Sequence, residues 1–135
     1  MSKIIRLYLV TVPVFFLVDL VWLGVVARDF YRSQVGSLMA DPIVWWAAIL
    51  YYLLSIAGII FFAVVPAIDS GRWTKALLLG AAFGFFTYMT YDLTNLATLQ
   101  GWSVTLAVVD IAWGTTLCGA VATVSYVIGT RALGI

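Results

Sequence analysis

The sequence predicts an all-α integral membrane protein, a bundle of four transmembrane helices forming a single domain over residues 1–135. Hydrophobic residues make up 64% of the chain and charged residues 10%, whereas a soluble domain carries about 25% charged residues to cover its surface. The apolar residues fall into four runs of about 20 residues or more, the length that crosses a bilayer as a helix. Because lipid offers the backbone no hydrogen-bond partners, each run should be helical.

The first predicted span covers residues 7–26. It begins after two basic residues and ends at the polar segment 28–32. A secretory signal has a similar basic start. However, this run is long, contains Asp19 and ends without a clear small-residue cleavage site. We therefore expect a retained helix.

The other three predicted spans follow at short intervals. The second covers residues 43–68 and begins with tryptophan and tyrosine side chains, which are typical of the headgroup boundary. A polar turn leads to the third span, residues 76–99, and a tight turn leads to the fourth, residues 104–128. The third span contains the stripe Gly80-x-x-x-Gly84, and we expect this stripe to pack within the bundle rather than to form a dimer face.

The basic residues predict the orientation. One side of the membrane receives Lys3, Arg6, Arg72, Lys75 and Arg131. The other side receives Arg28 and Arg32, which Asp29 and Asp41 partly offset. Since lysine and arginine concentrate in cytoplasmic loops, both termini are expected in the cytoplasm.

Three of the spans carry an aspartate, namely Asp19, Asp92 and Asp110. At about 1.5 Å of rise per residue, all three carboxyls fall in the outer half of the bilayer. An acid at mid-span costs roughly 2.5–3.5 kcal/mol, so intramembrane acids are candidates for function. The sequence therefore predicts a layer of carboxyls that binds a ligand, an ion or protons, and the alternative is a structural role in helix packing.

The first and fourth spans share an Asp-x-x-Trp pattern. Asp19 precedes Trp22 by three residues, as Asp110 precedes Trp113, and this spacing puts each pair on one helix face. The two helices run in opposite directions, so a local two-fold axis is expected to relate them. An indole is a donor only. We therefore expect each carboxylate to accept the indole N–H of the other helix.

The third span contributes further polar and aromatic side chains. Tyr88, Asp92 and Asn95 follow i, i+4, i+7 spacing and share one face, and Tyr91 lies on the adjacent face. The complete candidate site is Asp19, Trp22, Tyr88, Tyr91, Asp92, Asn95, Asp110 and Trp113. These residues predict a polar pocket with aromatic walls, although tryptophan and tyrosine also serve as interfacial anchors.

Missing residue types exclude several functions. Histidine is absent, which excludes histidine-ligated haem, histidine metal triads and histidine acid–base catalysis. We expect no cofactor, while a bound cation is compatible with the carboxyls and its identity does not follow from the sequence. The net charge of +1 gives no basic surface for nucleic acid. A single cysteine, Cys118, allows no intramolecular disulfide.

Three strings resemble the signature segments of a known family: Asp19-Leu-Val-Trp22, Thr90-Tyr-Asp-Leu-Thr-Asn-Leu-Ala97 and Asp110-Ile-Ala-Trp-Gly114. The family is domain of unknown function 2177, and the resemblance extends over nearly the whole chain, including Phe30-Tyr31 and Tyr51-Tyr52. It implies a four-helix, multi-pass protein of the bacterial cytoplasmic (inner) membrane. It supplies no catalytic residues.

Three functions are open at this point. The favoured one is a small transporter or an ion- or solute-binding protein that uses the aspartates, and a transporter of this size would need to form a homo-oligomer. The second is a non-catalytic accessory subunit of a larger membrane complex, associated with lipid or pigment. The third and least favoured is a lipid-acting membrane enzyme, because the sequence shows no nucleophile–base constellation.

Overall fold

The computed structural model describes residues 2–26, 28–40 and 42–135, so the expectations about Asp41 and the side chain of Arg28 fall outside it. The chain is 87% helical, with no strand in the described part. Among these residues, four helical spans are long and apolar enough to cross a membrane. They are Lys3–Val25, Trp45–Ser70, α5 (Trp73–Thr98) and α6 (Val104–Arg131). The predicted four-span, all-α membrane fold is confirmed.

The first span consists of α1 (Lys3–Val21) and a π-helical turn, Trp22–Val26. Ser2 caps its start, because its hydroxyl accepts the backbone N–H of Ile5. Single π-helical turns within α-helices are rare and frequently occur at functional sites. This turn begins with Trp22, one of the predicted site residues.

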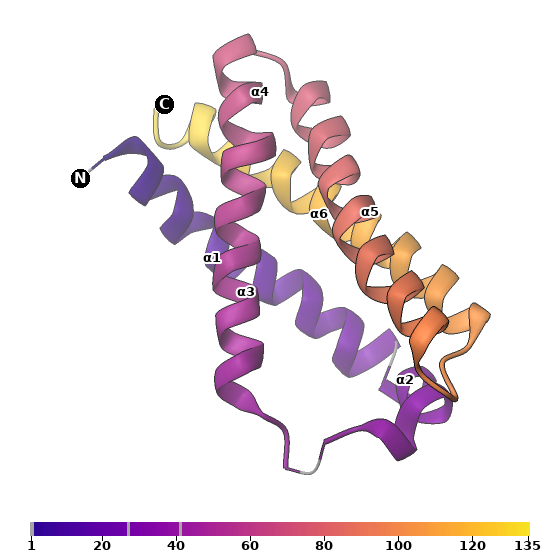
Figure 1. Cartoon of the computed structure of the whole chain (residues 1–135). Helices are drawn as coiled ribbons and strands as arrows, with labels where there is room; N and C mark the ends of the chain where they lie inside the picture. Colours follow the sequence, from indigo (N-terminus) through magenta and orange to yellow (C-terminus); the bar gives the residue numbers. More distant parts are fainter. Residues whose placement is uncertain (1, 27, 41) are drawn as a thin grey trace.

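A short helix, α2 (Arg28–Val35), follows where only a polar connection was expected. It lies at the same end of the bundle as the turn between α5 and α6 (Figure 1). The hydroxyl of Ser103, at the start of α6, donates a 2.5 Å hydrogen bond to the Gln34 side chain of α2. This contact holds α2 across the end of the bundle, over the predicted site.

The second span joins α3 (Trp45–Ile59), a π-helical turn (Ile60–Val64) and α4 (Val65–Ser70). Pro66 lacks a backbone N–H and cannot complete the regular hydrogen-bond ladder, and the π-helical turn ends two residues before it, at Val64. Gly71 ends α4 in the left-handed conformation, with φ of 67°.

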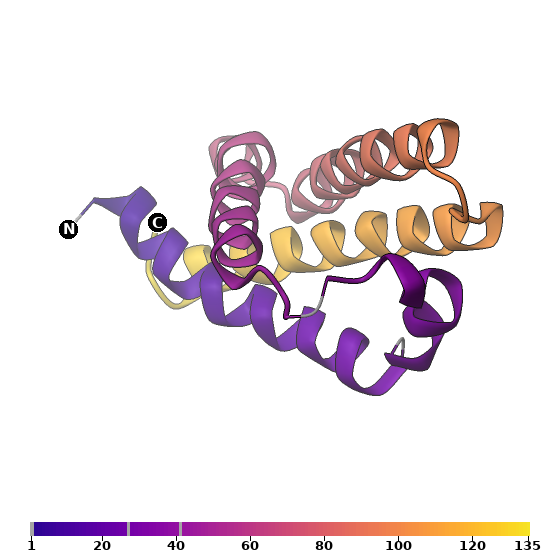
Figure 2. The same cartoon turned by 60° about the horizontal axis from the view of Figure 1, so that its bottom comes forward.

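The helices α5 and α6 form the most extensive contact in the bundle, an antiparallel hairpin (Figures 1 and 2). A Cβ atom on Gly84 would lie 2.0 Å from the carbonyl oxygen of Gly114, and one on Gly80 would lie 2.6 Å from that of Cys118. Glycine is therefore required for the two backbones to approach this closely. The expectation that this stripe packs within the bundle is confirmed.

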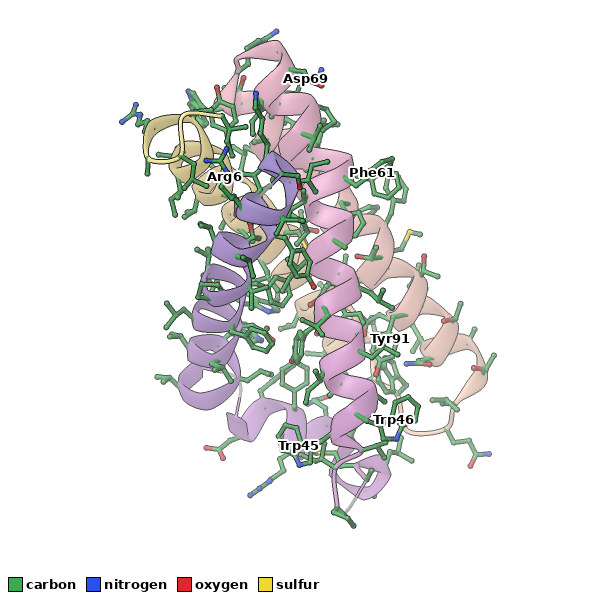
Figure 3. The ribbon with its side chains drawn as sticks, turned by 90° about the vertical axis from the view of Figure 1, so that its left-hand side faces the viewer. Arg6, Trp45, Trp46, Phe61, Asp69 and Tyr91 are labelled. Carbon is green, nitrogen blue, oxygen red and sulfur yellow. The ribbon has the colours of Figure 1, made fainter. Side chains whose placement is uncertain are left out.

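Both termini lie at the end of the bundle that carries the α4–α5 turn (Figure 1). Arg6 and Asp69 mark this end, and Trp45 and Trp46 mark the opposite one (Figure 3). The arrangement agrees with the predicted order of the spans. Which end faces the cytoplasm stays a prediction.

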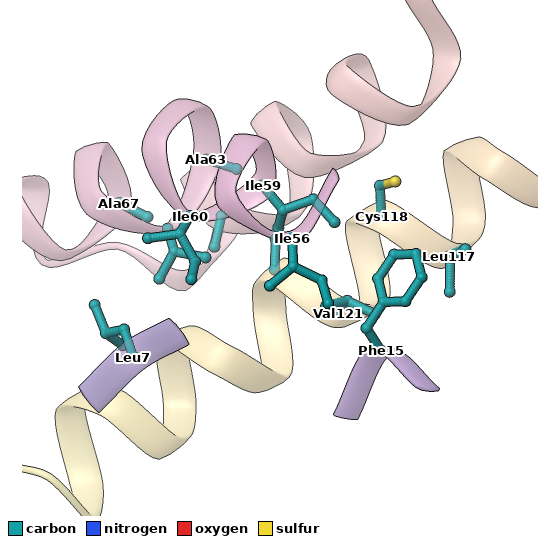
Figure 4. Packing of buried hydrophobic residues seen from close by; sticks show 13 residues of the cluster. Leu7, Phe15, Ile56, Ile59, Ile60, Ala63, Ala67, Leu117, Cys118 and Val121 are labelled. Carbon is teal, nitrogen blue, oxygen red and sulfur yellow. The ribbon is translucent and has the colours of Figure 1, made fainter. Parts of the chain in front are cut away.

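A buried apolar core joins α1, α3, α4 and α6 (Figure 4). It includes Leu7, Phe15, Ile56, Ile59, Ala63, Ala67, Leu117 and Val121. Many other large apolar side chains point outward, and Trp46, Phe61 and Leu78 are each more than two-thirds exposed (73%, 71% and 68%). An apolar surface of this extent requires lipid as its solvent.

Candidate functional site

A cavity of about 450 Å³ lies between the helices, toward the end opposite the termini. Its volume is that of a site for a small organic molecule. Its lining comprises Asp19, Trp22, Leu23, Tyr31, Val35, Ala48, Tyr51, Tyr52, Thr87, Tyr88, Tyr91, Trp102, Leu106, Asp110 and Trp113. The walls are therefore mainly aromatic, with two carboxyl groups among them.

Toward this end α3 diverges from α5 and α6 (Figure 1). Tyr51 and Tyr52 line the cavity from α3, and Tyr88 and Tyr91 line it from α5. Tyr51 and Tyr91 line the cavity and are about half exposed (47% and 55%), so they stand at its rim; Tyr91 is labelled in Figure 3. An opening between α3 and α5 would face the lipid.

One half of the Asp-x-x-Trp pairing forms as expected. Asp19 is buried, and its Oδ1 accepts the indole N–H of Trp113 at 3.3 Å. The indoles of Trp113 and Trp22 stack nearly parallel, at 7° with their centroids 4.3 Å apart. The predicted contact between the first and fourth spans is confirmed for this pair, and the two indoles form one aromatic wall.

The other half differs from the expectation. Trp22 donates its indole N–H to the hydroxyl of Tyr31 at 3.3 Å, and that hydroxyl donates to Oδ1 of Asp110 at 2.5 Å. The predicted direct bond from Trp22 to Asp110 is therefore wrong. Helix α2 brings in a phenol, which can accept and donate at once, so it bridges a donor-only indole and a carboxylate.

Tyr31 lies outside the membrane-spanning segments and is half-buried. Burial, followed by the hydrogen bond to Asp110, raises the pKa of Tyr31 above its ordinary value of 10.0. The phenol therefore stays protonated at neutral pH and acts as a permanent donor to Asp110.

Asp92 is completely buried, and neither of its carboxylate oxygens has a hydrogen-bond partner. It does not line the cavity and instead lies behind the wall, where its carboxyl adjoins that of Asp110. Asp110 in turn interacts electrostatically with Asp19. The structure thus brings the three intramembrane aspartates together, two in the cavity wall and one behind it.

Tyr88 and Asn95 have different positions. The ring of Tyr88 lies directly on the α6 backbone, since a Cβ atom on Gly114 would fall 2.1 Å from its Cγ, and it lines the cavity. Asn95 lies outside the lining and adjoins Tyr91 one turn away on α5. Of the eight predicted site residues, Asn95 and Asp92 do not reach the cavity surface.

Tyr31 and Trp102 line the cavity but were not predicted to belong to the site. The position of Tyr31 depends on the folding of α2. The only sequence feature that pointed to Tyr31 was its place in the Phe30-Tyr31 pair of the family resemblance. Trp102 comes from the tight turn between α5 and α6, where its indole lies near Asp92. That indole N–H is buried without a hydrogen-bond partner.

The charges around the cavity favour one class of ligand. No lysine or arginine side chain that the structure describes lines it. Within the described residues, no group of three or more histidine, cysteine, aspartate or glutamate side chains is arranged to hold a metal ion. Carboxylates beside aromatic faces instead suit an organic cation, which the ring faces attract electrostatically.

A bundle of apolar spans around an intramembrane acidic pocket defines a small multi-pass integral membrane protein. The chain belongs to the domain of unknown function 2177 (DUF2177) family, described as predicted membrane protein, and the family model matches residues 4–127. The family that the sequence motifs resemble is thus confirmed. No curated protein and no solved structure matches the chain.

Proposed function

We propose that this protein binds a monovalent organic cation in the aromatic cavity and serves as a small transporter or solute-binding protein of the bacterial cytoplasmic membrane. One observation carries the proposal. Asp19 and Asp110 place two carboxyls in the wall of a cavity of about 450 Å³ that is otherwise mainly aromatic. Acids inside a membrane are usually retained for binding or transport, because their burial is costly.

The chemistry of the walls supports an organic cation over a metal ion. Calcium requires six to eight oxygen ligands, and magnesium requires a regular octahedron. An organic cation needs only a carboxylate and ring faces, and each ring contributes about 0.5–2 kcal/mol. Trp113 donates to Oδ1 of Asp19, and the phenol of Tyr52 lies beside the same carboxyl. The carboxyl and these rings together form the part of the wall that a cation would contact.

The distribution of basic residues supports an orientation with both termini in the cytoplasm, so the cavity would lie in the outer half of the bilayer. The half nearer the termini is filled by the core around Ile60 and Val64. A single copy therefore offers a pocket rather than a continuous path. For transport, we propose that the protein works as a homo-oligomer.

The binding test uses tetraphenylphosphonium, a rigid aromatic cation, titrated into protein in lipid nanodiscs by calorimetry. Asp19→Asn retains an oxygen that accepts the Trp113 indole but removes the negative charge. We expect its affinity to fall roughly tenfold or more, the equivalent of about 1.5 kcal/mol for a charged contact. Trp22 and Trp113 fluorescence should change as the wild-type site fills.

The matched control is Asp69→Asn, because Asp69 is exposed at the opposite end of the bundle (Figure 3). This variant should bind tetraphenylphosphonium with the wild-type affinity. Neutral triphenylphosphine oxide should bind every variant much more weakly than tetraphenylphosphonium binds the wild type. Equal affinity in Asp19→Asn, or no binding by the wild type, would contradict the proposal. Uptake of the cation into proteoliposomes then separates a transporter from a binding protein.

A further inference from the structure

The carboxyl of Asp92 lacks what a buried charge requires. It has no exposed surface, and both of its oxygens are without a hydrogen-bond donor. A buried carboxylate is normally held by donors or a cation, because an isolated charge is strongly disfavoured in an apolar medium. The indole N–H of Trp102 lies near this carboxyl but makes no hydrogen bond to it, and no cation among the described residues faces it. Asp92 is therefore poorly suited to carry a full negative charge.

The register of α5 on α6 explains what Asp92 contacts. Gly80 meets Cys118 and Gly84 meets Gly114, so each step of four residues along α5 matches a step of four back along α6. Two further steps bring Asp92 within one turn of Asp110, and the two carboxyls adjoin. The tight glycine contact thus forces one carboxyl against another.

Two adjoining carboxyls can bond to each other only through a proton. A carboxylate is purely an acceptor, whereas a carboxylic acid donates one hydrogen bond. A single proton between Asp92 and Asp110 would convert the unpartnered oxygen of one into a donor to the other. Pairs of carboxyls in contact in a low-dielectric site share a proton in this way.

The groups facing this pair come from four elements. Tyr31 of α2 donates to Asp110, Tyr91 of α5 lies close to both carboxyls, and Asp19 of α1 lies across the cavity. The indole of Trp102 is the remaining polar neighbour. None of the described lysine or arginine side chains lines this cavity, so positive charge must come from a proton or from a ligand.

We infer that Asp92 and Asp110 share one exchangeable proton and release it when a cation enters the cavity. The second half of this inference rests on the proposed function. One proton leaves as one monovalent cation arrives, so the net charge of the site is conserved. The proton passes to water at the α2 end, where Tyr31 reaches Asp110 from outside the membrane-spanning segments. The pair is thus a proton site that couples cation binding to pH.

The first test detects the proton itself in the absence of any cation. Infrared spectra of the wild type at neutral pH should contain the carbonyl stretch of a protonated carboxyl, shifted on transfer to D₂O. Asp92→Asn is nearly isosteric and should remove this band, whereas Asp69→Asn should keep it. The absence of the band in the wild type, or its persistence in Asp92→Asn, would overturn the inference.

The second test counts protons. Tetraphenylphosphonium is added to wild-type protein in weakly buffered solution with a pH-sensitive dye. Release of about one proton per bound cation is expected, together with affinity that rises about tenfold for each unit of pH while the pair is protonated. Asp92→Asn should bind with neither proton release nor this pH dependence. Binding by the wild type without proton release would overturn the coupling.

The outcomes separate the two proposals. A protonated-carboxyl band that depends on Asp92, in a protein that binds no organic cation, would support the shared proton and contradict the proposed function. Cation binding by a protein whose spectrum lacks this band would support the proposed function and contradict the shared proton. If Asp92→Asn does not fold, the wild type can still overturn the inference, because the absence of the band or of proton release contradicts it without any variant.

Discussion

Tyr31 is the residue that completes the site. Its hydroxyl joins the indole of Trp22 to the carboxylate of Asp110, and it comes from a helix outside the spans. The fixed bridge orients Asp110, whose carboxyl both faces the cavity and adjoins Asp92. A single phenol therefore holds a carboxyl of the cavity wall and the buried carboxyl pair together.

Replacing Tyr31 with phenylalanine tests this bridge. Tyr31→Phe leaves the Trp22 indole and Oδ1 of Asp110 without their partner, so we expect a loss of about 1–3 kcal/mol in the free energy of unfolding. Since the folded-state pKa of Tyr31 is raised, the phenol contributes its full stability at every pH below about 10, and the contribution falls as pH rises further. Unfolding in mixed micelles, followed by tryptophan emission at several pH values, measures both effects.

Tyr126→Phe is the matched control for Tyr31→Phe. Tyr126 is half-buried near the end of α6, and its hydroxyl makes no hydrogen bond with the described residues. The same removal of a hydroxyl should there change stability by less than about 0.5 kcal/mol. Similar losses in the two variants would mean that the bridge contributes nothing specific.

The sequence allowed some of these contacts to be predicted. The contact between Asp19 and Trp113 followed from matched spacing on antiparallel helices and from the donor-only chemistry of indole. The Tyr31 bridge could not be predicted in the same way, because it depends on where α2 folds back. The buried state of Asp92 depends likewise on the packing of α5 against α6, which residue spacing alone does not determine.

At the scale of elements, the α5–α6 hairpin sets the geometry of the site. Its glycine contacts fix the register that brings Asp92 to Asp110, and Gly114 leaves room for the ring of Tyr88. The remaining helices pack around this pair, and α3 diverges from it toward the end where the cavity lies (Figure 1). Changes in the glycine stripe should therefore affect both stability and the site.

Gly84→Ala tests the hairpin. The added methyl group would meet the Gly114 carbonyl oxygen at 2.0 Å, so the helices must separate. We expect a loss of at least about 1–3 kcal/mol, typical of overpacking, measured as earlier thermal unfolding in detergent. Gly24→Ala is the control, since a Cβ atom there meets nothing within 4 Å. A wild-type unfolding curve for Gly84→Ala would show that the close contact is absent.

The four spans could be predicted because hydropathy and length alone require them in lipid. Observed bounds lie within a few residues of those expected. Helix α2 was not predicted, because a segment of eight residues with three charges resembles a polar connection between spans. Tertiary contacts such as that of Ser103 with Gln34 hold it in place. The π-helical turns could not be predicted either, because they have no hydrophobic period of their own.

At the scale of the whole molecule, the two ends differ. The termini, Arg6 and Asp69 lie at one end, and α2 and the α5–α6 turn lie at the other (Figures 1 and 3). The cavity lies toward the second end. The orientation in the membrane thus decides whether the cavity lies in the outer or the inner half of the bilayer.

Cysteine labelling tests the orientation. In a Cys118→Ala background, Ser2→Cys and Gln100→Cys place one thiol at each end, and both native residues are exposed. If the termini are cytoplasmic, a membrane-impermeant maleimide should label Gln100→Cys in intact bacterial cells and Ser2→Cys only after lysis. Labelling of Ser2→Cys in intact cells would reverse the orientation, and labelling of both would indicate dual insertion.

The stacked indoles of Trp22 and Trp113 give the protein an optical property of its own. Two identical chromophores 4.3 Å apart and nearly parallel couple their electronic transitions. Where their transition moments are twisted relative to each other, such a pair produces paired circular-dichroism bands of opposite sign, which a lone indole lacks. The partners come from the π-helical turn after α1 and from α6. The bands would therefore record the separation of those two helices in a bilayer without any added label.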